Sequence, residues 1–407
     1  MSEVIGEGSY GCVHRPSLKC KKKKIDYENK ISKILTKKHL NDEMKEYKQI
    51  KKIDKRNEIH LGTPTTCVPS KVNKSDIDKC DNFISDEIDN YGLMILPDGG
   101  KDLEYFASSC RNLKNTRSNT KMIHKFWIEC HRLLYGIYLM QKKGYIHHDL
   151  KAQNIVYNDK ENRINFIDFG LMIDKASVVK ELNESKYTLA TPFWYFPFEF
   201  MFLNKKTFLN ASLINEKTAI SKEKLFEKLE KNPQFAKYRK MFYNNTVNTD
   251  KFITKNDDDF YSMFLSIKES EYDNFIEKSL NTIDIYGTGM GLLYVLRRSS
   301  HLINKDFFKE LYNLFLNMIT ASLDKRLTID IALSKYEELL EKYKILDKTL
   351  TFKDHKLQTS KKSSTITNIT KKIKISKEEK KKLLKPPVYN KTKKGGFNNT
   401  IRSPYSL

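Results

Sequence analysis

Hydrophobic residues recur along this chain with two different periods. Residues 2–13 read as a strand, a glycine turn and a second strand, and the run Ile31–Leu35 alternates in the manner of a strand. From Asn41 to Ile53, and again from Lys121 to Gln141, apolar side chains return every three or four positions, which predicts helices with one buried face. Helical spacing then dominates as far as residue 346.

The change from strands to helices falls near residue 97. The apolar run Tyr91–Leu96 ends at Pro97-Asp98-Gly99-Gly100, and proline with glycine terminates a strand and begins a connector. A chain of 407 residues is long enough for two compact units. We therefore predict an α+β protein with a small β-rich N-lobe at 1–97 and a larger, mainly helical C-lobe at 98–346.

Much of the positive charge lies at the C-terminal end. The formal net charge is +23, and residues 351–407 alone contain 16 Lys/Arg against 3 Asp/Glu, a net charge of +13. This segment has few aromatic residues and cannot bury enough apolar area to offset its ordering entropy. We predict a basic, disordered tail at 347–407. Its lysines form either a solvated spacer or a binding segment for nucleic acid or an anionic membrane. In the second case they would not read sequence, because no base-stacking aromatics are interleaved with them.

The cellular compartment is inferred from the first residues and from the cysteines. No stretch approaches the ~20 apolar residues of a membrane-spanning helix, and the opening MSEVIGEGSYG lacks the basic and apolar regions of a signal peptide. All six cysteines fall in the first third, at spacings that match neither a zinc site nor a small disulfide scaffold. We expect free thiols, a cytoplasmic location and a monomer.

The segment Gly6-Glu7-Gly8-Ser9-Tyr10-Gly11 is rich in glycine. Its three glycines stand where a hairpin closes over phosphates, because a Cβ there would block the approach of the backbone. Taken alone, this spacing is also common in ordinary turns. A dinucleotide-binding motif would need the glycines to open a helix, whereas the residues after Gly11 indicate a strand.

Two further sequence motifs support a functional role for the glycine-rich segment. His147-His148-Asp149-Leu150-Lys151-Ala152-Gln153-Asn154 and Asp168-Phe169-Gly170 resemble the catalytic loop and the metal-binding motif of eukaryotic-type protein kinases, in the family's order and separation. A polar surface loop would not explain why all these strings occur together. The resemblance covers roughly residues 3–346. It implies the bilobal protein-kinase fold, ATP and Mg²⁺ as cofactors and proteins as substrates.

The resemblance assigns roles to residues. Asp149 would be the catalytic base that orients the attacking hydroxyl, and Lys151, the choice seen in serine/threonine kinases, would contact the transferred phosphate. Asn154 and Asp168 would hold Mg²⁺ through oxygen ligands. The nucleotide would lie against the glycine-rich residues Ile5, Gly6, Glu7, Gly8, Ser9, Tyr10, Gly11, Cys12 and Val13.

The family also places a lysine on the third strand, held by a glutamate of the next helix. Lys33 is our choice for the lysine, with Lys30 as a competitor and a solvated strand-edge charge as the plain alternative. For the partner we favour Glu46 over Glu43, because the apolar spacing after Glu46 matches the family. The sequence alone does not decide which of the two glutamates pairs with the lysine.

Three more matches lie in the second half. The resemblance makes Asp284-Ile285-Tyr286-Gly287-Thr288-Gly289 the start of a core helix whose aspartate anchors the backbone of the catalytic loop. Glu199 and Arg326 would form a buried salt bridge, with Phe198 in place of the usual proline. Thr191-Pro192 would form the pocket for the residue after the acceptor, which favours serine/threonine over tyrosine.

His148 and the spacing after Glu199 depart from the family. Many kinases have at the position of His148 an arginine that binds the phosphorylated activation loop, and a histidine is mostly neutral at cytosolic pH. We therefore hypothesise that activity does not depend on activation-loop phosphorylation. The 85 positions from Glu199 to Asp284 imply an insertion at about 203–280. Within it, 222–242 reads as one amphipathic helix, either a substrate dock or an excursion packed on the C-lobe.

The insertion, the short segment before Gly6 and the Lys/Asn/Ile-rich composition are similar to protein kinases of large nucleocytoplasmic DNA viruses, which implies host cytoplasm or virion as the location. Three rival functions are less well supported by the sequence. A pseudoenzyme scaffold is disfavoured because Lys33, Asp149, Asn154 and Asp168 are all present. A nucleic-acid-binding protein is supported only by the charge. A small-molecule kinase does not explain Thr191-Pro192.

Overall fold

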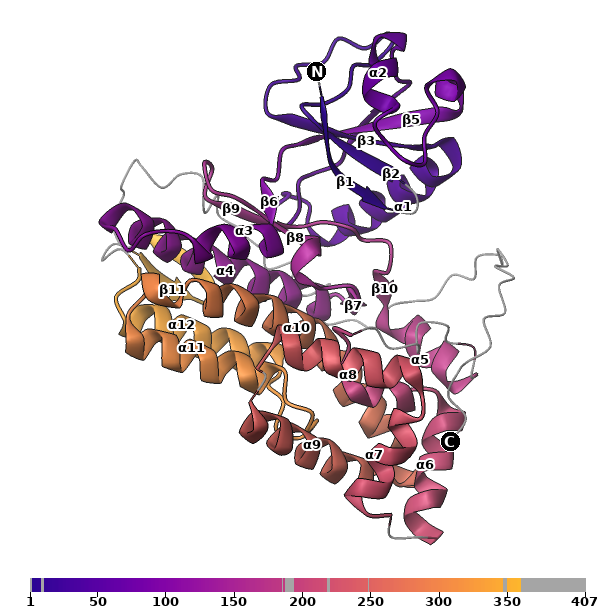
Figure 1. The fold of residues 1–407 in the computed structure, drawn as a ribbon, viewed down its shortest axis with the longest axis vertical. Coiled ribbons are helices and arrows are strands. Elements are labelled where there is room, and N and C mark those ends of the chain that lie inside the picture. Colours follow the sequence, from indigo (N-terminus) through magenta and orange to yellow (C-terminus); the bar gives the residue numbers. More distant parts are fainter. Residues whose placement is uncertain are drawn as a thin grey trace, which may run out of the picture.

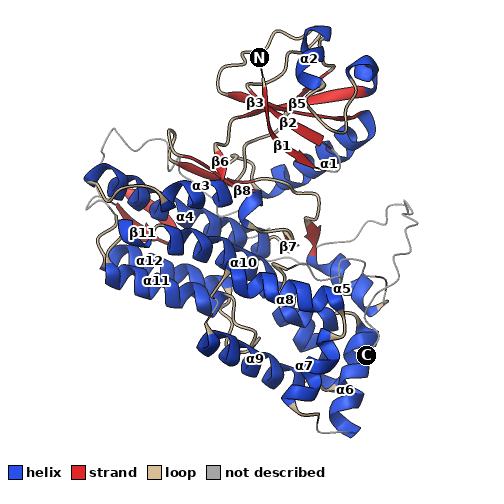
Figure 2. Cartoon of the chain, viewed as in Figure 1, coloured by secondary structure: helices blue, strands red, loops and turns tan. Residues whose placement is uncertain are grey.

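The computed structural model describes residues 2–8, 11–184, 186, 194–217, 220–247, 249–346 and 350–359. They form a small lobe that carries the N-terminal sheet and a larger helical lobe (Figures 1 and 2). The chain leaves the small lobe at the end of β5 (Tyr91–Pro97). A β-rich first lobe followed by a mainly helical second lobe agrees with the predicted fold class.

The N-lobe is built on an antiparallel sheet with strand order β1-β2-β3-β5-β4. The helix α1 follows β3 directly, because Thr36 Oγ1 accepts a hydrogen bond from the amide of His39 and so caps the first turn. The helix therefore begins four residues before the predicted Asn41. Besides β5, the elements of this sheet and its helix are β1 (Glu3–Gly8), β2 (Gly11–Arg15), β3 (Lys30–Thr36), β4 (Thr65–Cys67) and α1 (Lys37–Ile53).

The two faces of the sheet belong to two hydrophobic clusters. Leu35 packs in the main core together with Tyr47 and Ile50 of α1. Ile34, its neighbour on β3, points to the other face and into a smaller cluster with Ile77. That second face is covered by the segment 68–90, whose short helices are Lys71–Asn73, α2 (Lys74–Ile77) and Ser85–Asn90.

Two disulfide bonds tie the segment 68–90 and its flank to the sheet. One joins Cys12 of β2 to Cys80, and the other joins Cys20 to Cys67 of β4. Cys110 and Cys130 are free and buried. The expectation of six free thiols is therefore wrong for four of them. It failed because the paired cysteines are 68 and 47 positions apart in the sequence, so that only the folded sheet brings them together. Because disulfides are rare in cytosolic proteins, the cysteines no longer support a reducing compartment.

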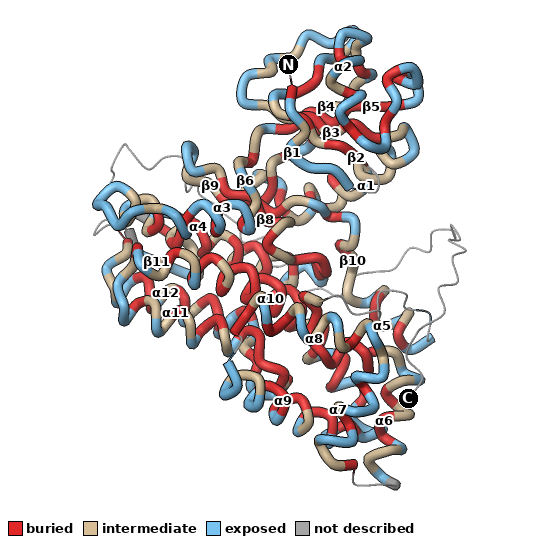
Figure 3. Tube along the Cα trace, viewed as in Figure 1, coloured by how far each residue is buried: buried red, intermediate tan, exposed pale blue. Residues whose placement is uncertain are grey.

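The C-lobe is organised around α10, which Figure 3 shows as an almost continuously buried helix. It packs against α3, α4 and α11. Although α4 and α10 have 26 and 27 residues, no helix in the described parts of the chain has both the length and the apolar character needed to cross a membrane. Outside the insertion, the described helices of the C-lobe include α3 (Leu103–Arg111), α4 (Arg117–Lys142), α5 (Lys175–Asn183), α10 (Tyr272–Arg298), α11 (Lys305–Met318) and α12 (Ile329–Lys342).

Short strands at the boundary of the lobes carry the candidate catalytic residues. One sheet has the order β6-β8-β9, and β7 pairs with β10. The amide of Phe166 on β9 donates to the carbonyl of Ile59, so this small sheet also contacts the N-lobe. The strands are β6 (Lys101–Asp102), β7 (Tyr145–Ile146), β8 (Ile155–Asn158), β9 (Arg163–Phe166) and β10 (Ile173–Asp174).

The insertion is a set of helices packed on the C-lobe. The predicted single helix 222–242 is wrong, since Asn232 caps a new helix and Pro233 occupies its first turn. The buried rings of Phe235, Phe242 and Phe260 contact Phe198, so the insertion is a packed excursion. Its helices are α6 (Lys205–Lys217), α7 (Lys222–Glu230), α8 (Pro233–Asn245) and α9 (Asp250–Leu265).

An antiparallel hairpin follows α12, formed by β11 (Leu350–Lys353) and β12 (Lys356–Thr359). The ring of Phe352 stacks on His131 of α4, with centroids 4.6 Å apart, and Leu357 is buried. Disorder from residue 347 onward is therefore wrong for residues 350–359. The rest of the predicted tail, 347–349 and 360–407, lies outside the described residues.

We expect the Cys12→Ser/Cys80→Ser variant to lose about 2–4 kcal/mol of unfolding free energy, because the bond closes a long loop of the unfolded chain. Urea denaturation monitored by fluorescence measures the loss. A variant with serine at Cys12, Cys20, Cys67 and Cys80 is the control, and its midpoint should not respond to dithiothreitol. Alkylation of Cys12 in denaturant without reductant would contradict the assignment.

Candidate active site

The glycine-rich segment forms the β1–β2 hairpin, in which Gly8 pairs with Gly11. Ser9 and Tyr10, at its tip, lie outside the described residues. A Cβ added to Gly6 or Gly8 would meet no atom of the described residues within 4 Å, whereas one at Gly11 would lie 2.6 Å from Cε of Lys33. Gly11 is therefore needed for Lys33 to lie against the hairpin, and the other two glycines border open space.

The side chains of the hairpin divide between the two faces of the sheet. Val13 is opposite Lys33 in the β2–β3 register, on the face that carries the candidate site. Cys12 points to the opposite face, because successive strand residues alternate. Its bond to Cys80 places it in the smaller hydrophobic cluster, which contains Ile34 and Ile77. The carboxylate of Glu7 accepts hydrogen bonds from the amides of Asp81 and Asn82. The Cys12 side chain therefore faces away from the candidate site, and the predicted nucleotide contacts of Cys12 and of exposed Ile5 stay expectations.

Lys33 forms its ion pair with Glu43, and the structure thereby corrects the predicted partner Glu46. Both glutamates lie on the same face of α1, since they are three residues apart. The cap at Thr36 starts α1 early, and the first of the two glutamates then falls next to β3. Lys33, and not Lys30, is the strand lysine that the helix holds.

Glu46 is directed toward the Asp168-Phe169-Gly170 segment. Its carboxylate oxygens lie 3.5 and 3.8 Å from the position that a Cβ on Gly170 would take. Burial raises the pKa of Glu46 to about 7, and the negative charges of Glu43 and Asp168 add to the shift. The site therefore contains an acidic side chain that titrates near neutrality, which the sequence motifs do not reveal.

The loop of Asp149 is fixed by a carboxylate in the centre of α10. Asp284 accepts hydrogen bonds from the amides of His147 (2.8 Å) and His148 (2.9 Å). His148 has a φ of +73°, a strained value that the two bonds help to hold. The predicted anchoring is confirmed, although Asp284 lies in the interior of α10 and not at its start.

Asp149 is 6% exposed and its carboxylate is surrounded by donors. Nζ of Lys151 lies 3.2 and 3.1 Å from the two oxygens. Nδ2 of Asn154 donates to Oδ2 at 2.7 Å and to the Asp149 carbonyl at 2.8 Å. The hydroxyl of Tyr195 donates to Oδ1. The sequence strings brought together Asp149, Lys151 and Asn154, but gave no signal for Tyr195.

Asp168 follows β9 and has a φ of +62°. The amide of Ile167, just before it, donates to the carbonyl of Asn154 at 3.0 Å, which holds the two predicted metal ligands on adjacent segments. The next residue, Phe169, is buried and contacts the rings of Tyr47 and His147. Asp168 is itself exposed, so its carboxylate is open to the space between the lobes.

His148 is buried among aromatic rings. Its ring lies 5.6 Å from that of Phe196 and 5.8 Å from that of Phe200. Burial lowers the pKa of His148 to about 3, and that of neighbouring His147 to about 4. His148 is therefore neutral at every physiological pH.

The segment that carries Tyr195 is anchored by a fully buried ion pair. Arg326 donates to both carboxylate oxygens of Glu199, and both side chains are 0% exposed. This confirms the predicted pair. Of the predicted acceptor pocket, Thr191 and Pro192 lie outside the described residues.

A cavity of about 210 Å³ adjoins the catalytic loop. Its lining includes Lys151 and Tyr195 together with Met241 and Asn245 of α8. The insertion thus reaches the neighbourhood of the Asp149 loop. The other side chains around the cavity include Glu104, Gln153, Trp194 and Tyr294.

Comparison with known proteins gives a family match and two relatives. A family model described as protein tyrosine and serine/threonine kinase matches residues 1–212. The probable serine/threonine-protein kinase mkcD of Dictyostelium discoideum is 40% identical over 72 residues, 17% of this chain and 11% of that protein. The serine/threonine-protein kinase mig-15 of Caenorhabditis elegans is 29% identical over 87 residues, 21% of this chain and 7% of that protein. The aligned segments are thus small parts of both relatives.

We expect Glu46→Gln to raise the melting temperature of the nucleotide-free protein more at neutral than at acidic pH. The folded-state pKa of Glu46, about 7, exceeds its ordinary value of 4.5. Between these values the unfolded chain binds fewer protons than the folded one, so stability falls as the pH rises through this window. Glutamine cannot ionise, so the Glu46→Gln variant does not lose this stability as the pH rises.

Thermal scans across the window measure the effect. Glu43→Gln is the matched variant, because it leaves Lys33 without its partner and should lower the melting temperature at both ends. A gain in Glu46→Gln that does not depend on pH would contradict the assignment.

Proposed function

The chain belongs to the protein tyrosine and serine/threonine kinase family, and from that premise we propose that it transfers the γ-phosphoryl group of ATP to serine and threonine hydroxyls of proteins. The observation that carries the proposal is the carboxylate of Asp149, held between Lys151 and Asn154 on a loop whose backbone is bound to Asp284. Phosphoryl transfer depends on positioning and charge, and this arrangement provides both.

In the proposed reaction the acceptor hydroxyl binds next to Asp149, which orients it and takes its proton. A bond forms between the acceptor oxygen and the γ-phosphorus, while the bond from that phosphorus to the oxygen shared with the β-phosphate breaks and ADP leaves. Lys151 moves from the carboxylate toward the transferred group. Lys33, held by Glu43, binds the α- and β-phosphates.

The residues at this place fit Mg²⁺. Asn154 uses its Nδ2 on Asp149 and so keeps its amide oxygen for a cation, and the carboxylate of Asp168 is exposed. Oxygen ligands of this kind are those that Mg²⁺ prefers. The open space beside Gly6 and Gly8 leaves room for phosphates. Bound Mg²⁺ would neutralise the charge that develops on the phosphate oxygens.

The preference for serine and threonine is supported by Lys151 and by Thr191-Pro192, and both relatives are named as serine/threonine kinases. The wider assignments are proposals from the sequence. They are a viral origin with host cytoplasm or virion as the location, a monomer, and an anionic partner, nucleic acid or membrane, for the basic tail. The hairpin of β11 and β12 would hold the start of that tail on α4.

We expect Asp149→Asn to lower phosphate transfer to a mixed protein substrate by about 10²–10⁴-fold, because the amide cannot accept the hydroxyl proton. Labelled ATP with Mg²⁺ and phosphosite mapping measure the transfer. Asp86→Asn, an exposed change on the far side of the N-lobe sheet, is the matched control and should behave as wild type. Label on tyrosine alone would contradict the serine/threonine assignment.

We also expect activity to persist without phosphate on the activation segment. Neutral, buried His148 offers a phosphate no positive charge. Single changes to alanine at Ser177, Ser185 and Thr188 should leave the rate within about twofold of wild type. Asp174 caps α5 by accepting hydrogen bonds from the amide and the hydroxyl of Ser177, whereas Ser185 and Thr188 lie outside the described residues. Lost activity at any of the three, with the melting temperature unchanged, would contradict this.

A further inference from the structure

Tyr195 contacts the catalytic carboxylate although no sequence motif assigns it a role. Its hydroxyl donates to Oδ1 of Asp149, and Nζ of Lys151 lies 5.1 Å from the centre of its ring. The side chain is 6% exposed. One residue thus touches both groups proposed to act on the acceptor and on the phosphate.

The phenol is a dependable donor. Burial raises the pKa of Tyr195 well above its ordinary value, and the charges of Asp149 and Asp168 raise it further. The hydroxyl therefore stays protonated at any pH at which the protein is folded. Because a buried hydroxyl without a partner is costly, the bond to Asp149 also fixes where the ring lies.

The hydrogen bonds on Asp149 leave room for a substrate once Lys151 has moved away. Oδ2 accepts from Asn154 and Lys151, and Oδ1 accepts from Tyr195 and Lys151. Each carboxylate oxygen has two lone pairs, so both are filled in this state. When Lys151 turns toward a phosphate, one lone pair on each carboxylate oxygen of Asp149 becomes free to accept a hydrogen bond. Tyr195 and Asn154 then still hold the carboxylate from its two ends.

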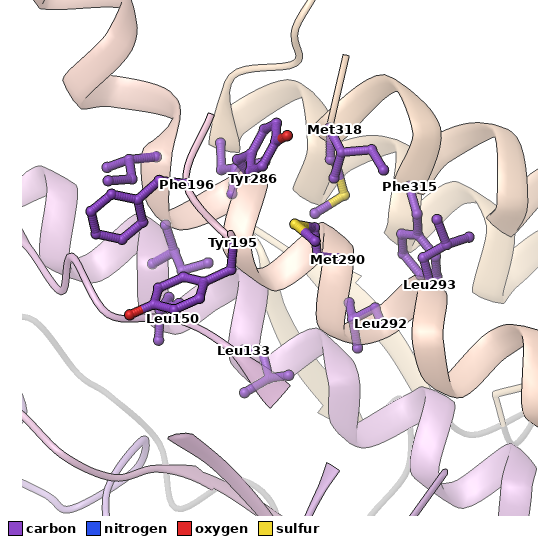
Figure 4. Packing of buried hydrophobic residues seen from close by; sticks show 14 of the residues in the cluster. Leu133, Leu150, Tyr195, Phe196, Tyr286, Met290, Leu292, Leu293, Phe315 and Met318 are labelled. Atoms are coloured by element: carbon purple, nitrogen blue, oxygen red, sulfur yellow. The ribbon is translucent and has the colours of Figure 1, made fainter. Parts of the chain in front are cut away.

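The backbone that carries Tyr195 is rigid on its C-terminal side. Four residues later Glu199 is bound by Arg326, with both side chains inaccessible to solvent. The ring itself packs edge-on against Trp194 and Phe196. Figure 4 shows Tyr195 extending from this packed segment toward Leu150, the residue between Asp149 and Lys151. The hydroxyl is therefore placed by the core of the C-lobe.

We propose that Tyr195 is a positioning residue for phosphoryl transfer: its hydroxyl holds Oδ1 of Asp149 while Lys151 leaves for the phosphate, and its ring gives Lys151 a cation–π contact beside the carboxylate. The proposal is founded on the function proposed above. It assigns the hydroxyl to the chemical step and not to binding of either substrate.

The decisive variant is Tyr195→Phe, which keeps the ring and its contact with Lys151 but removes the hydroxyl. We expect kcat to fall roughly tenfold, a part of the 10²–10⁴ that a general base contributes, with KM for ATP and for the protein substrate within about twofold of wild type. The split between an altered kcat and unaltered KM values separates a role in the chemical step from a merely structural one.

Tyr195→Leu removes ring and hydroxyl together and should lower kcat further than Tyr195→Phe. Tyr272→Phe is the matched control: it is buried to a similar extent, but its hydroxyl donates to the carbonyl of Leu203, so kinetics should not change. Melting temperatures are measured for every variant.

A Tyr195→Phe protein with wild-type or increased kcat would overturn the proposal, as would an equal loss in the Tyr272→Phe control. An inactive wild type would instead refute the proposed function itself.

Discussion

The geometry of the site depends on the buried carboxylate of Asp284. It lies in the middle of α10, the most enclosed helix of the C-lobe, and holds two consecutive amides of the catalytic loop. Burial raises the pKa of Asp284 to about 6, and the two hydrogen bonds oppose the rise, so the ion pays a desolvation cost for holding the loop. A Cβ on Gly287 would lie 2.0 Å from the carbonyl of Leu150. Loop and helix are thus fitted to each other, and Asp149 is held close to α10.

The N-lobe positions its part of the site by constraints on both faces of the same hairpin. On the face that carries the candidate site, Gly11 lies against Lys33, and Glu43 holds that lysine. On the opposite face, the bond from Cys12 to Cys80 fixes β2 to the segment 68–90, which covers the sheet. Because neighbouring strand residues point in opposite directions, one strand serves both purposes. The rigidity of the hairpin is therefore linked to cysteines that do not face the nucleotide site.

Sequence strings predicted Asp149, Asn154 and Asp168 as site residues because phosphoryl chemistry needs these groups at short, fixed spacings, and the structure places them on neighbouring segments. They also identified Glu199 and Arg326, although these are distant in sequence, because each has a local signature. Sequence strings failed where the contact between two residues depends on how helices and strands are placed in the fold. Glu43 and Glu46 share a helix face, and only the start of α1 at Lys37 decides between them. The two disulfides needed the sheet order, and the break at Asn232 depends on a cap within an amphipathic pattern.

The insertion accounts for one departure that the sequence left unexplained. Phe198 stands where the family has proline, a residue that would stiffen the chain before Glu199. In the structure Phe198 is buried against Phe235, Phe242 and Phe260 of α8 and α9. Aromatic contacts of this kind contribute about 0.5–1.5 kcal/mol each beyond area burial. The added helices therefore hold the segment between Tyr195 and Glu199 in place. They connect the insertion to the carboxylate of Asp149 through packing, without any contact to substrate being required.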